Sequence, residues 1–151
     1  IILTLLKNAA NVFDTLKHLQ LSDYQPFQLV IFPSDLTANH NQPHCFQWDG
    51  ESLTELQQTL PITSSGVDYP EVYQARKNTF ERMVTVANPT VKQLINFHQS
   101  QQDDGKLSVQ MSRTDAQTVS FSRICVGLNV EFEYFDYLNN KRCLCELARG
   151  L

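Results

Sequence analysis

The sequence predicts an α+β fold in which antiparallel sheets carry helices packed on their outer sides. Strand-like segments in the second half follow one another through short polar turns, as in a meander. The helical patterns form separate groups and do not alternate with strands, which argues against a parallel sheet. With 151 residues, of which 42% are apolar, the chain has the size and composition of one globular domain. We therefore expect residues 1–151 to form a single domain around one core.

Two short helices are predicted at the start of the chain. The apolar segment Ile1–Lys7 has no capping residue ahead of it, so it resembles the inside of a helix and indicates further residues upstream. Asn11, followed three residues later by Asp14, predicts the N-cap of a second helix whose inner face includes Leu16. Residues 8–11 would join the two helices, or the whole segment would form one continuous helix.

A first group of strands follows these helices. Residues 27–32 are rich in Phe, Leu, Val and Ile and predict a strand, whereas residues 33–43 read as a polar loop. Residues 44–48 predict a second strand, and Asp49-Gly50 is a strong hairpin signal that returns the chain along residues 52–57.

Helices and then a meander complete the chain. Asp68, with Glu71 three residues later, predicts a helix start, and the helix would end near Ala87. A second helix would begin at Asn88-Pro89 and run to about Gln101. The meander would then contain four strands: Leu107–Met111, Thr118–Val126, Val130–Tyr137 and Lys141–Leu147.

The cysteines indicate reduced thiols. The chain has four Cys and no CxxC pair, which differs from a small secreted disulfide framework. Cys143 and Cys145 stand two apart in a predicted strand and share a face, so we expect them to fill the core. We therefore expect a cytoplasmic protein.

The charge and hydropathy patterns exclude two classes of partner. The net charge is −4 and the basic residues are scattered, so we expect no nucleic acid partner. No apolar run reaches the roughly 18–20 residues that span a bilayer, so we expect no membrane association.

The histidines are weak candidates for a site. His40, His44 and Cys45 lie within six positions, but Pro43 prevents a helix that would align them and no fourth ligand follows at a suitable spacing. We expect no metal and no cofactor. His18 and His98 lie late in predicted helices and lack the neighbours of a catalytic triad.

Two other places suit a small-molecule pocket. Ser64 and Ser65 lie at a strand-to-helix turn, where their hydroxyl groups can line a pocket or cap the turn. Arg113 lies at a strand end beside Asp115. Its guanidinium group would either bind a substrate carboxylate or form a structural pair with Asp115. The residues alone leave both alternatives open.

Several segments, in order, resemble the NRDE family, which is named for an Asn-Arg-Asp-Glu motif and is related to the transport-and-Golgi-organisation proteins. They cover most of residues 22–135, and the last one is the most specific. The segments are Tyr24-Gln25-Pro26-Phe27, Trp48-Asp49-Gly50, Ile62-Thr63-Ser64-Ser65, Arg76 with Phe80, and Leu107 to Ser120 with its Met-Ser-Arg centre.

The resemblance implies a four-layer αββα sandwich like that of N-terminal-nucleophile hydrolases. Their nucleophile is the first residue of the mature chain, whose own α-amino group can serve as the base. This chain begins with Ile1 and lacks the Asn-Arg-Asp-Glu motif, so we expect it to be the C-terminal portion of a larger domain. A missing N-terminal segment would complete the sandwich and supply the nucleophile, and no catalytic residue is expected in these 151 residues.

The resemblance also implies two functions. The full protein would hydrolyse a C–N bond of a small amide, or it would handle a small molecule without catalysis, as eukaryotic relatives suggest for haem. Ser64, Ser65, Arg113 and Asp115 would form the substrate-binding pocket in either case. The expected partners are a small-molecule ligand, the missing segment and a second copy of the chain, because a partial sandwich exposes an apolar sheet face.

Overall fold

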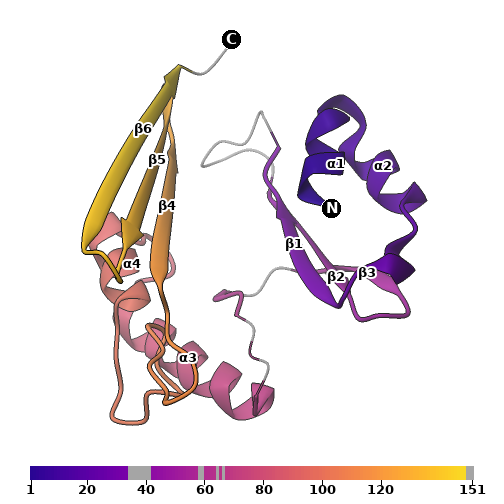
Figure 1. Cartoon of the computed structure of the whole chain (residues 1–151). Coiled ribbons are helices and arrows are strands. Elements are labelled where there is room, and N and C mark those ends of the chain that lie inside the picture. Colours follow the sequence, from indigo (N-terminus) through magenta and orange to yellow (C-terminus); the bar gives the residue numbers. More distant parts are fainter. Residues whose placement is uncertain (34–41, 58–59, 64, 66, 149–151) are drawn as a thin grey trace. The chain divides into compact units, whose positions relative to one another are not determined.

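The structure is a computed structural model that describes residues 1–33, 42–57, 60–63, 65 and 67–148. It divides into two compact units, Ile1–Thr59 and Leu60–Leu151 (Figure 1). Each unit combines helices with a three-stranded antiparallel sheet, which confirms the predicted α+β class. Each unit also has a hydrophobic cluster of its own, where one core was expected. The single domain over residues 1–151 stays a prediction.

The helices of the first unit begin close to the predicted positions. Asn11 is the N-cap residue of the second helix, but its side chain makes no capping hydrogen bond. The segment between the two helices forms a short 3-10 helix, which confirms the predicted joint. The helical segments are α1 (Ile2–Lys7), η1 (Ala9–Asn11), α2 (Val12–His18) and η2 (Leu21–Asp23).

The sheet of the first unit has the order β1-β2-β3, with β1 at Phe27–Ile31, β2 at His44–Trp48 and β3 at Leu53–Leu56. The predicted hairpin is confirmed. Gly50 adopts φ 105°, and the Asp49 carboxylate accepts backbone hydrogen bonds at 2.7 and 2.8 Å within the turn. Glycine tolerates this left-handed conformation because it has no Cβ atom.

One face of this sheet is covered by the helices of its own unit. Phe46 and Trp48 are 7% exposed and pack with Leu5 and Leu16 of the helices. The indole N–H of Trp48 donates to the Tyr24 carbonyl oxygen at 3.1 Å, so its polar atom is satisfied inside the cluster.

The second unit begins with α3 (Tyr69–Met83) and α4 (Val91–His98). Thr90 caps α4 through a reciprocal capping box with Gln93. Helix α3 ends four residues before the predicted Ala87, because Val84 is already extended. Phe80, Val84 and Phe97 form the buried cluster between the two helices.

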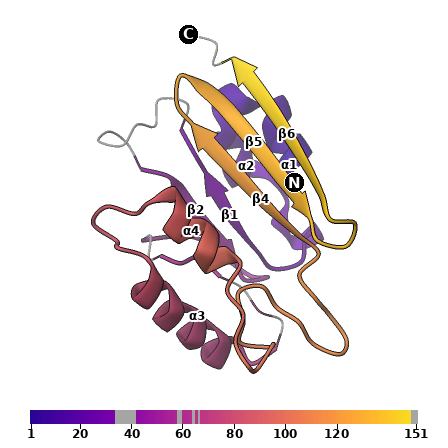
Figure 2. The same cartoon turned by 90° about the vertical axis from the view of Figure 1, so that its left-hand side faces the viewer.

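The sheet of the second unit has the order β4-β5-β6, with β4 at Ser120–Val126, β5 at Asn129–Asp136 and β6 at Lys141–Ala148 (Figure 2). The predicted meander is therefore confirmed for these three strands. The predicted strand Leu107–Met111 is wrong. The backbone of this segment pairs with loops instead: Gln110 N donates to Ser100 O at 3.1 Å, and Met111 exchanges hydrogen bonds with Thr118.

The two faces of this second sheet differ in character. Phe121, Glu133 and Arg142 lie on one face, and His98 of α4 lies against Phe121 with ring centroids 5.3 Å apart. The opposite face is apolar and largely exposed. It carries Ile124, Val126, Val130, Phe132, Tyr134, Cys143, Cys145 and Leu147.

The expectation that Cys143 and Cys145 fill the core is wrong, because both are exposed. They do share a face of β6, as the period of two requires. That face is the one turned away from α4, so no helix of the second unit covers it in the described residues.

Candidate functional site

The candidate site is a pocket of about 390 Å³ within the second unit. It brings together two of the side chains that the sequence singled out, Ser65 and Arg113. They come from segments nearly fifty residues apart in the chain. The complete lining is Ser65, Val67, Arg76, Val109, Met111, Arg113 and Thr118.

Arg113 is held by Asp115. Its Nη2 donates to Asp115 Oδ2 at 3.1 Å, while its Nε lies 3.0 Å from Oδ1 without the alignment of a hydrogen bond. The Asp115 side chain is 71% exposed, whereas that of Arg113 is only 22% exposed. Of the two alternatives that the sequence left open for Arg113, the structural pair with Asp115 is therefore present. It also orients the guanidinium group at the pocket wall, because a carboxylate on a tight turn limits its rotamers.

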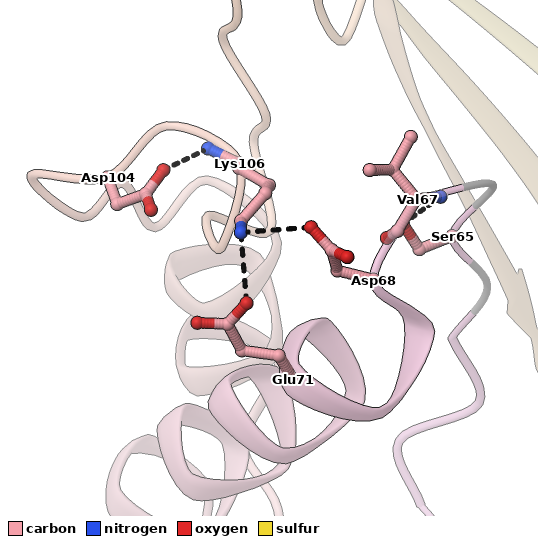
Figure 3. A network of polar contacts seen from close by, with 6 residues as sticks. All are labelled: Ser65, Val67, Asp68, Glu71, Asp104 and Lys106. Carbon is pink, nitrogen blue, oxygen red and sulfur yellow. Dashed lines mark hydrogen bonds and ion pairs between the residues drawn. The ribbon is translucent and has the colours of Figure 1, made fainter.

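Ser65 caps the turn that precedes α3. Its Oγ donates to the Val67 carbonyl oxygen at 2.6 Å and accepts from the Val67 N–H at 3.2 Å (Figure 3). The hydroxyl group thus has a local structural role as well as a place in the pocket wall. Ser64, its predicted companion, lies outside the described residues.

Arg76 lines the pocket, although the sequence analysis named it only within the family resemblance and not as a site residue. It lies four residues after Val72 and four before Phe80, so all three share the buried side of α3. Its Nη1 donates to Thr63 Oγ1 at 2.8 Å and its Nε to Ser108 O at 3.2 Å. Burial lowers the pKa of the Arg76 guanidinium group. The sequence signal that could have identified Arg76 as a site residue is its position on the apolar stripe of a helix.

Two backbone hydrogen bonds position Arg113 at the pocket. The Arg113 N–H donates to Ala116 O at 2.8 Å, which closes the turn that carries Asp115. Ser112 N donates to Gly105 O at 3.2 Å, and a Cβ atom on Gly105 would collide with the Ser112 carbonyl oxygen. Glycine at this position therefore permits the close approach that fixes the segment entering the pocket.

Lys106 ties the same loop to the start of α3. Its Nζ lies 2.9 Å from Glu71 Oε2 and 3.2 Å from Asp68 Oδ2, and its backbone N–H donates to the Asp104 carboxylate (Figure 3). The hydrogen bond to Glu71, followed by that to Asp68, raises the pKa of the Lys106 ammonium group.

The helix start predicted at Asp68 is confirmed, because α3 begins at the next residue, Tyr69. Asp68 is the N-cap residue, but it adopts φ 47° and its side chain makes no capping hydrogen bond. Both carboxylates bind Lys106 instead, and this ammonium group comes from a segment distant in sequence. A contact between distant segments has replaced a local one.

The remaining sequence candidates lie elsewhere. His44 bonds Glu55 at 2.8 Å and packs on Phe13, Cys45 beside it is buried, and His40 lies outside the described residues. Burial raises the pKa of the Cys45 thiol. Within the described part of the chain, no three His, Cys, Asp or Glu side chains gather as a metal site would require.

His98 and His18 have structural neighbours. The His98 imidazole lies between Phe97 and Phe121, and the water removed by this packing lowers the pKa of the ring. His18 Nδ1 lies 2.7 Å from the Asp14 carbonyl oxygen in the same helix. Over the residues that are described, no helix is long and apolar enough to cross a membrane.

The pocket lining has the chemistry of an anion site. Two guanidinium groups and two hydroxyl groups line it, and its described lining contains no carboxylate. Arginine suits carboxylate and phosphate groups because its planar fork can donate two parallel hydrogen bonds. Val67, Val109 and Met111 supply apolar wall for the rest of a ligand.

Comparison with known proteins gives no match to a family model, a curated protein or a solved structure. The resemblance to the NRDE family therefore stays a prediction.

Proposed function

We propose that the pocket of the second unit binds the anionic end of a small molecule. The observation that carries this proposal is the presence of Ser65 and Arg113 in one pocket, with Arg76 as a second guanidinium group. Arg113 would hold a carboxylate of the ligand, and Asp115 would keep Arg113 in position.

The proposed activity of the full protein is hydrolysis of a C–N bond in a small amide. This proposal rests on the resemblance to NRDE proteins, with the nucleophile on a residue outside this chain. The Ser65 hydroxyl and nearby backbone N–H groups would stabilise the oxyanion that develops during attack on the amide carbonyl. Arg113 would orient the substrate through its carboxylate, so that its contribution falls on binding and positioning.

The proposal includes a layered sandwich as the complete fold. Helices cover the apolar face of the first sheet, whereas the apolar face of the second sheet lies on the side away from α4. A second sheet packed on that face would give an αββα arrangement and bury its apolar side chains. We place this protein in the cytoplasm, in keeping with its four free cysteines.

Ligand binding tests the anion site directly. Isothermal titration would compare N-acyl amino acids with their C-terminal amides, which have the same shape but no carboxylate. We expect the acids to bind more tightly, and Arg113→Lys to weaken them by about tenfold because lysine lacks the planar fork. Arg82→Lys, at an exposed position of α3, is the matched control. Equal binding of acids and amides would contradict the proposal.

A non-catalytic binding protein is the second candidate function. The observation that favours it is the absence of Cys and His from the described lining of the pocket, together with the engagement of Ser65 in its own turn. The full-length protein decides between the two. If it exposes an N-terminal Cys, amine release from the acyl amino acids should disappear when that Cys is changed to Ala. Equal turnover by the unchanged full-length protein and by its Cys→Ala variant would exclude the enzymatic function.

A further inference from the structure

Strand β6 has an open edge suited to pairing. It pairs with β5 through an unbroken register from Asp136↔Lys141 to Asn129↔Ala148, and β5 is its one neighbour among the described strands. All eight residues of β6 are exposed. The strand contains neither a bulge nor a proline, two of the devices by which natural edge strands avoid pairing with another chain.

The charged side chains of β6 would face opposite charges if a second copy of the strand ran antiparallel beside it. Arg142 stands two residues before Leu144 and Glu146 stands two residues after it, and these three side chains share one face. We propose that two copies of this chain pair antiparallel through β6 about a two-fold axis at Leu144. Arg142 then lies opposite Glu146 of the partner subunit, and the same pair recurs on the other side of the axis.

The contacts that Arg142 and Glu146 already make leave both side chains accessible for this pairing. Arg142 binds Glu133 within its own sheet, yet its side chain is 62% exposed. Glu146 accepts one hydrogen bond from Asn129 at Oε1 and lies on the exposed strand. Opposite charges directly across two strands stabilise the pair, whereas like charges destabilise it.

Other registers lose these charge pairs. A shift by one residue would place Cys143 opposite Leu144 of the partner subunit, so the apolar face of one sheet would continue as the charged face of the other. A shift by two would set Arg142 opposite Leu144 of the partner subunit. The proposed register instead makes one six-stranded sheet with a continuous apolar face, and it places Cys143 opposite Cys145 of the partner subunit.

This last juxtaposition gives a sharp test of the register. Diamide oxidises two neighbouring thiols to a disulfide and takes up their two protons and two electrons as the hydrazine. Cys143→Ser alone and Cys145→Ser alone should each lose the covalent dimer on a non-reducing gel. A mixture of the two variants should regain it, because Cys145 of one chain then faces Cys143 of the other.

The double variant Cys143→Ser/Cys145→Ser controls for linkage through Cys45 or Cys125. Covalent dimer in either single variant beyond the level of this control, or none in the mixture, would overturn the proposed register.

Sedimentation tests the pairing without chemistry. The wild-type chain should show a concentration-dependent dimer, and Leu144→Lys should weaken association by about tenfold because two lysines then meet at the axis. Leu138→Lys is the matched control, since Leu138 and Leu144 are both 61% exposed and Leu138 lies in the turn before β6. A wild-type chain that is monomeric at every concentration, or equal weakening by both variants, would overturn the proposal.

Discussion

The sheets of the two units place their apolar faces differently. In the first unit, Phe46 of the central strand β2 lies beneath the helices of its own unit and is 7% exposed. In the second unit, Phe132 of the central strand β5 lies on the face turned away from α4 and is 39% exposed. A phenylalanine of the central strand is thus buried in the first unit, where helices of the same unit cover its face of the sheet. It is partly exposed in the second unit, where no described helix of that unit covers its face.

The charged face of the second sheet completes the contrast. Glu133 is 2% exposed, and its carboxylate binds both Arg123, at 2.8 Å, and Arg142. A buried carboxylate must be paired to offset its desolvation. The first sheet is therefore held to its helices by apolar packing, whereas the second sheet is held across its three strands by an ionic cluster.

Truncating the two phenylalanines should give the largest difference. Phe46→Ala should lower the free energy of unfolding by about 3–5 kcal/mol, because it leaves a cavity in a packed cluster. Phe132→Ala should cost under about 1 kcal/mol, since its ring is already partly hydrated. Denaturant unfolding measures both. The chain has one Trp, Trp48, so its fluorescence reports on the first unit and far-ultraviolet circular dichroism reports on the whole.

Equal losses in the free energy of unfolding for Phe46→Ala and Phe132→Ala would contradict the difference in burial between the two sheets. They would mean that the apolar face of the second sheet is covered in solution.

Removing the charge of Glu133 should give the next largest effect. Glu133→Gln keeps the shape of the side chain but leaves Arg123 and Arg142 without their counter-ion, so we expect a loss of about 2 kcal/mol in the free energy of unfolding. Glu131→Gln, on the same face of β5 but exposed, should change it by less than about 0.5 kcal/mol. Urea unfolding followed by circular dichroism distinguishes the two. A stable Glu133→Gln variant would show that packing alone holds this sheet.

Acid should weaken the second unit through His98. The folded state holds the pKa of this imidazole below its ordinary value of 6.5, so the unfolded chain binds the proton more readily. Stability should fall as the pH drops from about 6.5 through the lowered pKa. The variant His98→Phe keeps the aromatic contact and should lose this part of the acid sensitivity. A nuclear magnetic resonance titration checks the pKa, and a value at or above 6.5 would contradict the expectation.

The smallest effect is expected at Lys106. Its pKa is raised in the folded state, so its stabilising contribution is complete below the ordinary value of 10.5 and is lost as the pH rises through the raised pKa. Lys106→Met should therefore melt slightly earlier than the wild type at neutral pH, and the gap should close in alkali. Lys92→Met, at an exposed position of α4, is the control. A gap that stays constant with pH would show that the methylene stem, and not the charge, supports the loop.

Local signals predicted most of the fold. The strand predicted over residues 44–48 and the Asp49-Gly50 turn located the first hairpin, because such a turn fixes the register of the strands beside it. The segment Leu107–Met111 was misjudged as a strand. Its β-like composition does not show that loop atoms of Ser100 and Thr118 would satisfy its backbone.

The candidate site was predicted in part. The bond between Arg113 and Asp115 spans two residues, so its two partners were visible in the sequence. The contact of Lys106 with Glu71 joins residues 35 apart, and no local pattern indicates it. Arg76 could have been selected from its position on the apolar stripe of α3, but its bonds to Thr63 and Ser108 depend on how distant segments meet.

The close approach of Gly105 to Ser112 has a consequence for mutational tolerance. Any larger residue at 105 must push the Ser112 backbone away and with it the segment that carries Arg113. In a library of variants selected for ligand binding, position 105 should therefore accept only glycine, while the exposed Asp103 nearby varies. Retention of glycine at position 105, which touches no ligand, would then indicate the pocket as clearly as retention of Arg113 itself.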